Sequence, residues 1–100
     1  MIFAAKISEV PNWGKKVVTI NGREILLVNL KGNLYSCDNE CPHQGASLAG
    51  ALLKDAEHIS CPRHGYRFNM KTGACGDFPE YALNLYPVEV RGDEIMIGID

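Results

Sequence analysis

The chain has 100 residues, of which 46% are hydrophobic and 22% charged, and its formal net charge at pH 7 is −2. This composition is typical of one ordinary globular domain with a modest core, and it excludes intrinsic disorder. The ten Lys and Arg residues are scattered, so the sequence lacks the basic stripe that nucleic-acid binding needs, and we expect no nucleic-acid partner.

The N-terminal residues carry no recognisable targeting signal. The apolar stretch 1–5 ends at Lys6, whereas the apolar part of a signal peptide needs about 7–15 residues. The longest aliphatic run, residues 25–28, is far shorter than the ~20 residues that span a bilayer, so no membrane association is expected. We expect a cytoplasmic protein, in which the four cysteines are metal ligands, catalytic groups or core residues rather than disulfide partners.

The first half of the chain predicts short strands joined by tight turns. Residues 16–20 and 24–28 are β-branched and aliphatic, and Asn21-Gly22 between them is a strong hairpin signal. A second turn at residues 31–33 leads into a strand at 34–37. The first half of the chain thus predicts one hairpin followed by a further turn-bounded strand.

The second half continues the pattern with shorter elements. Only residues 46–54 could form a helical turn or two, and Gly50 weakens even that segment. The remaining elements are strands at 58–60, 66–68, 86–90 and 94–99, with turns at 71–73 and 92–93. We therefore predict an all-β fold of antiparallel sheets or a small barrel, formed by a single domain over residues 1–100.

Two loops, at about residues 38–48 and 60–68, differ from the rest of the chain. The first contains Cys41 and His43 as C-P-H-Q-G, and the second contains Cys61 and His64 as C-P-R-H-G. Seventeen residues separate His43 from Cys61, but a fold built of hairpins can bring the loops together. Two thiolates and two imidazoles suit either a tetrahedral zinc ion or a 2Fe–2S cluster.

The arrangement of these candidate ligands favours iron and sulfur over zinc. Zinc fingers usually group a Cys pair and then a His pair, whereas each loop here offers one of each. Two loops that straddle a two-iron cluster can each give one ligand to each iron. The neighbouring Pro stiffens each turn, and the neighbouring Gly lets backbone amides approach sulfur, which stabilises the charge gained on reduction.

With these motifs, the sequence resembles the Rieske iron–sulfur proteins, and most closely the small stand-alone Rieske ferredoxins that serve ring-hydroxylating oxygenases. The resemblance covers nearly the whole chain and includes the segments 35–40, 66–73 and 86–90 that flank the two boxes. It implies a Rieske-like fold with a two-loop cluster-binding subdomain and one 2Fe–2S cluster. It further implies that Cys41 and Cys61 ligate one iron, and that His43 and His64 ligate the other.

The resemblance also predicts the function and the redox behaviour. Respiratory Rieske proteins have a disulfide and a Ser hydroxyl beside the cluster, whereas Ala46, Arg63 and Tyr66 stand at those places here. We therefore expect a reduction potential toward the low end of the range of about −150 to +300 mV. The chain would be an electron carrier with no catalytic residues of its own, and no nucleophile or phosphate-binding motif suggests otherwise.

The expected partners are a flavin- or iron–sulfur-containing reductase and a terminal oxygenase. The chain itself is expected to be a monomer. Docking is expected around the two histidines, with Gln44, Ala46, Arg63 and Tyr66 at the surface. Arg63 is expected to pair with an acidic partner and to raise the potential slightly. Two alternatives remain: a small subunit of a larger enzyme, as in assimilatory nitrite reductases, and a zinc-stabilised interaction module.

The other notable residues have ordinary structural interpretations. Cys37 and Cys75 are predicted to be small buried side chains, and His58 to lie on a solvated strand face. Trp13, which follows Pro11, is predicted to pack against its own loop.

Overall fold

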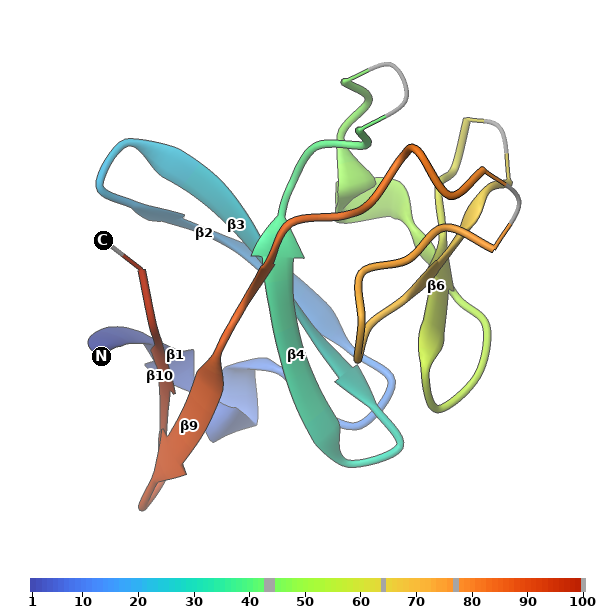
Figure 1. The fold of residues 1–100 in the computed structure, drawn as a ribbon. Helices are drawn as coiled ribbons and strands as arrows, with labels where there is room; N and C mark the ends of the chain where they lie inside the picture. The colour runs from blue at the N-terminus through green and yellow to red at the C-terminus, as the bar shows by residue number, and fades with distance from the viewer. Residues whose placement is uncertain (43–44, 64, 77, 100) are drawn as a thin grey trace.

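The structure is a computed structural model that describes residues 1–42, 45–63, 65–76 and 78–99. Its described strands form three antiparallel sheets (Figure 1), which confirms the predicted all-β class. The first sheet has the order β1-β10-β9, with bounds β1 (Ile2–Lys6), β10 (Glu94–Ile97) and β9 (Val88–Arg91). A short 3₁₀ helix, η1 (Ile7–Glu9), follows β1.

The second sheet is the central one, and its turns explain its register. Its order is β2-β3-β4-β8, with bounds β2 (Lys15–Ile20), β3 (Arg23–Leu30), β4 (Asn33–Asp38) and β8 (Leu85–Tyr86). Asn21 and Gly22 have φ values of 52° and 77°, and this pair of positive angles is the geometry of a tight type I′ hairpin turn. The hairpin predicted at this dipeptide is therefore confirmed.

Strand β3 contributes side chains to two hydrophobic cores, one on each of its faces. All its residues from Ile25 to Leu30 are buried. Leu26 and Val28 belong to the core that lies under the cluster loops, whereas Ile25 and Leu27 belong to the core against the β1-β10-β9 sheet. Alternate side chains of a strand point to opposite faces, so one strand supports both halves of the molecule.

The third sheet supports the two predicted cluster loops. Its order is β5-β6-β7, with bounds β5 (Leu52–Leu53), β6 (His58–Ser60) and β7 (Arg67–Asn69), and a 3₁₀ helix, η2 (Leu48–Gly50), precedes it. The buried side chains of Ile59 and Phe68 join this sheet to the core beneath it. The helical turn predicted within residues 46–54 is thus this one turn of 3₁₀ helix.

The polypeptide between β4 and β8, residues 39–84, is an insertion into the central sheet. Cys37 pairs with Leu85, and the Asp38 N–H donates to the carbonyl of Asn84 (3.1 Å). The insertion therefore begins and ends on neighbouring strands, and its two loops lie together at one end of the molecule (Figure 1).

Candidate metal centre

The first loop places Cys41 in a small closed ring of backbone hydrogen bonds. The Cys41 N–H donates to the carbonyl of Ala46 (2.8 Å), and the Gly45 N–H donates to the carbonyl of Cys41 (2.7 Å). Gly45 has a φ of 73°, a conformation that costs a non-glycine residue energy. The glycine of the C-P-H-Q-G box is therefore explained by the way the loop closes.

The second loop repeats this geometry at the same offsets. The Cys61 N–H donates to the carbonyl of Tyr66 (2.9 Å), and the Gly65 N–H donates to the carbonyl of Cys61 (2.9 Å). Gly65 has a φ of 72°. The two boxes are thus two copies of one backbone frame, in which the Cys begins the turn and the Gly four residues later ends it.

The two frames lie side by side. Cys41 and Cys61 are both buried, at 1% exposure each, in the core that also contains Leu48 and Ala51. A Cβ placed on Gly50, which follows the first loop, would lie 3.7 Å from the Cγ of Pro62 in the second. The structure therefore places the two cysteines that the sequence singled out in one core, on two loops that contact each other.

The other two predicted ligands, His43 and His64, lie outside the described residues, as does Gln44. Their assignment as ligands stays a prediction. What the described part of the loops does provide fits an iron–sulfur cluster: two thiols presented from matched turns, with backbone amides closing each turn. No disulfide joins any two of the four cysteines, all of which the structure describes.

The base of the first loop is held from two directions. On one side, the Asn39 N–H donates to the carbonyl of Glu24 in β3 (3.0 Å). On the other, the Tyr86 hydroxyl and the Asn84 amide both donate to the Asp38 carboxylate. Burial and the hydrogen bond to Asp38 raise the pKa of Tyr86, which keeps its hydroxyl a donor at neutral pH. Residues 38–39 are thereby fixed just before Cys41.

A third segment, which the sequence analysis did not include in the site, packs against the second loop. The Tyr66 ring lies 4.8 Å from the Phe78 ring and 6.5 Å from the Tyr81 ring, centroid to centroid, and Phe78 and Tyr81 are 5.9 Å apart. The sequence signal for this segment is the presence of Phe78 and Tyr81 shortly after the second box, but no local pattern tells such aromatic residues apart from ordinary packing. The structure shows instead one aromatic cluster, Tyr66–Phe78–Tyr81.

The close approach of two backbone segments holds this third segment in place. Gly73 has a φ of 81°, and a Cβ placed on it would lie only 2.4 Å from the carbonyl oxygen of Leu83. The Leu83 N–H donates to the carbonyl of Gly73 (2.7 Å). Only glycine allows this contact, which brings residues 78–83 back toward the cluster loops.

The remaining sequence predictions have mixed outcomes. Cys37 and Cys75 are buried, at 0% and 2% exposure, as predicted, and Arg63 is exposed. His58 is only half-buried, and its Nδ1 lies 2.9 Å from a carboxylate oxygen of Asp55. Trp13 is 47% exposed, so it packs less against its loop than predicted. Among the described residues, none lies in a helix long and apolar enough to cross a membrane.

Comparison with known proteins identifies the class. Residues 1–87 match the Rieske 2Fe-2S domain. The chain is 33% identical to the ferredoxin component of the naphthalene 1,2-dioxygenase system of Pseudomonas aeruginosa, over 98% of this chain and 94% of that protein. The chain therefore belongs to the Rieske 2Fe–2S domain family, and it is an electron-transfer protein with one Rieske cluster.

Solved structures agree with this assignment. The ferredoxin of carbazole 1,9a-dioxygenase from Nocardioides aromaticivorans superposes with a TM-score of 0.88 and 26% identity, covering 99% of this chain and 97% of that one. A ferredoxin chain in a complex of reduced oxygenase and oxidised ferredoxin of carbazole 1,9a-dioxygenase superposes with a TM-score of 0.85 and 25% identity, covering 97% and 100%. The predicted Rieske-like fold is thus confirmed.

Proposed function

We propose that this chain is a single-domain ferredoxin that takes one electron at a time from a flavin- or iron–sulfur-containing reductase and passes it to a terminal oxygenase. The observation that carries the proposal is the pair of matched Cys-Pro frames, held side by side at one end of the molecule. When bound, a cluster of this type supplies a one-electron redox couple in a range of about −150 to +300 mV.

The proposed ligands follow from these frames and from the family. Cys41 and Cys61 would hold one iron, and His43 and His64 the other. The backbone ring around each cysteine fixes its position in the loop, and the apolar core that contains Cys41 and Cys61 excludes water from that side. A rigid site that is shielded from water on one side keeps the reorganisation of protein and solvent small when the cluster gains or loses an electron.

The proposed partners follow from what the similar proteins are. The relative from Pseudomonas aeruginosa is a ferredoxin component of a dioxygenase system, and one similar structure is a ferredoxin bound to its oxygenase. We propose that docking involves His43, His64, Gln44, Arg63 and Tyr66. Arg63 is exposed beside Cys61 and suits this role, whereas Tyr66 is half-buried in the aromatic cluster and offers only part of its surface. Transient redox contacts are small, below about 1,200 Å² in total, so this end of the molecule is large enough.

The experiment follows electron transfer with purified protein in two steps, reduction of the chain and then oxidation by an oxygenase. The chain is loaded with its cluster, reduced by one electron without oxygen, and mixed with the terminal oxygenase of the naphthalene or carbazole system while its visible absorbance is recorded. We expect one electron per chain to leave for the oxygenase. Material that holds neither iron nor acid-labile sulfide after reconstitution would overturn the proposal, and a colourless protein with bound zinc would replace it with a structural role.

We further propose that the protein is a cytoplasmic monomer. Gel filtration should then give an apparent mass near that of the 11.0 kDa chain. Obligate co-purification with a large subunit would instead favour the small-subunit alternative, as in nitrite reductases.

A further inference from the structure

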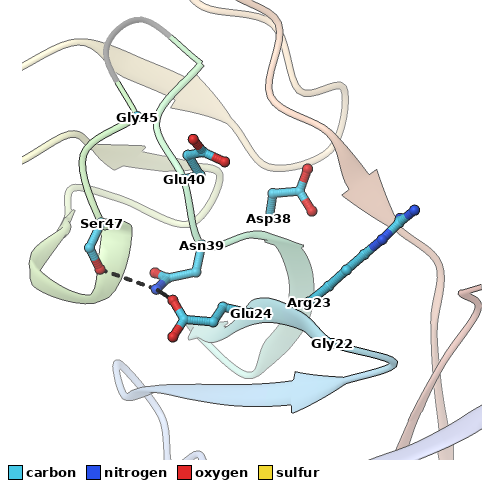
Figure 2. A pocket seen from close by; sticks show the side chains of 8 residues that line it. All are labelled: Gly22, Arg23, Glu24, Asp38, Asn39, Glu40, Gly45 and Ser47. Atoms are coloured by element: carbon cyan, nitrogen blue, oxygen red, sulfur yellow. Dashed lines mark hydrogen bonds between the residues drawn. The ribbon is translucent and has the colours of Figure 1, made fainter.

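A recess of about 510 Å³ lies beside the first cluster loop, between that loop and the turn that joins β2 to β3. Three carboxylates surround it, those of Glu24, Asp38 and Glu40 (Figure 2). Arg23 is the one cationic side chain among its described lining residues, and it points away from Glu24 and Glu40 (Figure 2). The recess therefore has an excess of negative charge.

These carboxylates differ from most others that the structure describes. Elsewhere, Glu9, Asp55, Glu57, Glu89, Asp93 and Glu94 each lie within 4 Å of a basic group. Within the described part of the chain, no Lys, Arg or His forms an ion pair with Glu24, Asp38 or Glu40. Arg23 interacts instead with the Tyr86 hydroxyl. Among the described residues, the carboxylates of Glu24 and Glu40 are thus not paired with a basic side chain, whereas Arg23 lies near Asp38 through their shared partner Tyr86.

A buried acceptor in the wall of the recess adds a second, independent observation. Asn39 is only 7% exposed, and its amide nitrogen donates to Glu24 (3.2 Å) and to Ser47 (3.1 Å). Its amide oxygen, in contrast, is buried and accepts no hydrogen bond. Figure 2 shows this side chain between Glu24 and Ser47. An acceptor left without a donor is unfavourable, so this buried oxygen adds a local energetic cost at the wall of the recess.

The shape of the site decides which cation it suits. Among the described residues, no three acidic, His or Cys side chains converge closely enough to hold a metal ion. The recess is also much larger than an ion. A guanidinium group has five N–H donors in a planar fork, so it can reach separated carboxylates at once, whereas an ammonium group is a compact point charge.

We propose that the recess receives an arginine side chain of a redox partner and thereby orients the partner on the first cluster loop. This inference rests on the proposed function as an electron carrier. Asn39 and Glu40 directly precede Cys41, and the Glu40 Oε1 atom lies 3.1 Å from a Cβ placed on Gly45. An arginine bound here would lie against the loop that contains Cys41. Unneutralised carboxylates also attract a basic partner over a distance and raise the association rate.

The first test measures binding without electron transfer. Oxidised, cluster-loaded protein labelled with ¹⁵N is titrated with acetyl-Gly-Arg-Gly-amide, and with matched peptides containing lysine or citrulline. We expect saturable amide shifts centred on Gly22, Glu24 and Ser47, with the arginine peptide binding more tightly than the other two. The double variant Glu24→Gln/Glu40→Gln should bind it about fivefold or more weakly. The control Glu89→Gln/Glu94→Gln changes the net charge equally and should bind as the unmodified protein does.

The second test measures the transfer rate to the oxygenase at low and high salt. The Glu24→Gln/Glu40→Gln variant should transfer about tenfold more slowly at low salt, with a weaker salt dependence. Its reduction potential is measured in parallel and should rise slightly, because two negative charges near the first cluster loop are removed. Equal binding of arginine and lysine peptides, shifts spread over the whole surface, or an unchanged rate in this variant would overturn the inference. If the unmodified protein transfers no electron, the proposed acceptor is wrong, and the peptide titration still decides whether the recess binds arginine.

Discussion

The four cysteines are equally buried, so burial alone does not separate ligands from core residues. Cys37 lies inside β4, where burial and the nearby Asp38 charge raise its pKa to about 12 and keep it a neutral thiol. Cys41 and Cys61 instead begin tight turns closed by glycine. The local backbone, which the Cys-Pro and Gly spacing predicted, is what distinguishes the two kinds.

We predict that replacing Cys41 or Cys61 with Ala abolishes the cluster, because each thiolate is one of the four proposed ligands. Replacing Cys37 or Cys75 with Ala should leave it intact and lower the free energy of unfolding by only about 1–2 kcal/mol, the cost of a small cavity. Iron and acid-labile sulfide per chain, with the visible spectrum, provide the measurement. Loss of iron in Cys75→Ala but not in Cys61→Ala would contradict the ligand assignment.

A redox titration should place the reduction potential toward the lower end of the range of about −150 to +300 mV. The reason is that the described loops contain no disulfide and no Ser at the places of Ala46, Arg63 and Tyr66. A value near +300 mV would show that other groups compensate.

Arg63→Glu should lower the potential slightly and slow transfer to the partner. If neither quantity changes, Arg63 has no role in redox tuning or docking.

At the scale of elements, local sequence signals predicted the strands that are joined by a tight turn. They missed strands whose pairing partner lies far away in the sequence. The hairpins at Asn21-Gly22 and at Gly92-Asp93 formed as predicted. Strand β1 was missed because its pairing with β10 joins the two ends of the chain, and β5 was missed because it is only two residues long. Such strands exist because a partner is in place, which local sequence patterns do not record. The strand predicted at 86–90 is divided at Pro87 into the end of β8 and most of β9.

Glycine substitutions can separate the cost of an unfavourable φ angle from the cost of a steric clash with a neighbouring backbone. Gly73→Ala should lower the free energy of unfolding by about 3 kcal/mol or more, because the new Cβ meets the Leu83 carbonyl as well as an unfavourable φ. Gly92→Ala, with a φ of 62° and no atom within 4 Å of its Cβ, should cost only about 1 kcal/mol. Urea unfolding measures both. Equal losses would show that the close approach at Gly73 relaxes without cost.

The aromatic cluster should protect the metal centre. Phe78→Ala removes two ring contacts, worth about 1–3 kcal/mol together, and should loosen the segment that packs on Tyr66. We expect the visible absorbance to bleach several-fold faster in the presence of a chelator. Phe3→Ala removes a similarly exposed ring from the far sheet and serves as the control. Equal bleaching rates in the two variants would show that the cluster has no protective role.

At the scale of the whole molecule, the sequence predicted the class, the two loops and the four candidate ligands, since the boxes are local motifs. It could not predict the acidic recess, because Glu24 comes from the β2–β3 hairpin and Glu40 from the cluster loop. Nor could it predict that β3 serves two cores. Both features arise only when distant segments meet.

The pairing of the chain ends makes stability depend on pH. The hydrogen bond and charge of Lys6 hold the pKa of Asp93 below its usual value, and Asp93 in turn raises the pKa of Lys6. The unfolded chain therefore binds a proton at Asp93 more readily, so this contribution is present above about pH 4 and is lost as the pH falls further. At the alkaline end, it is lost as the pH rises through the raised pKa of Lys6.

Melting temperatures of the unmodified protein and of Asp93→Asn check this dependence. The two should differ slightly at pH 7 and coincide near pH 3, because the pair is exposed and screened. Glu80→Gln, which removes an exposed carboxylate without a described ion pair, is the control. A difference that persists at pH 3 would show that the loss in Asp93→Asn is not electrostatic.

The cluster-bearing segment leaves β4 just after Cys37 and returns to β8 at Leu85, and these two residues are directly opposite each other on adjacent antiparallel strands, about 4.5–5.5 Å apart between Cα atoms. Any host protein with two neighbouring antiparallel strands offers the same spacing. Residues 39–84 are therefore suited to grafting as one piece onto a host that also supplies the apolar contacts of β3 and the hydrogen bonds that hold the base of the first loop.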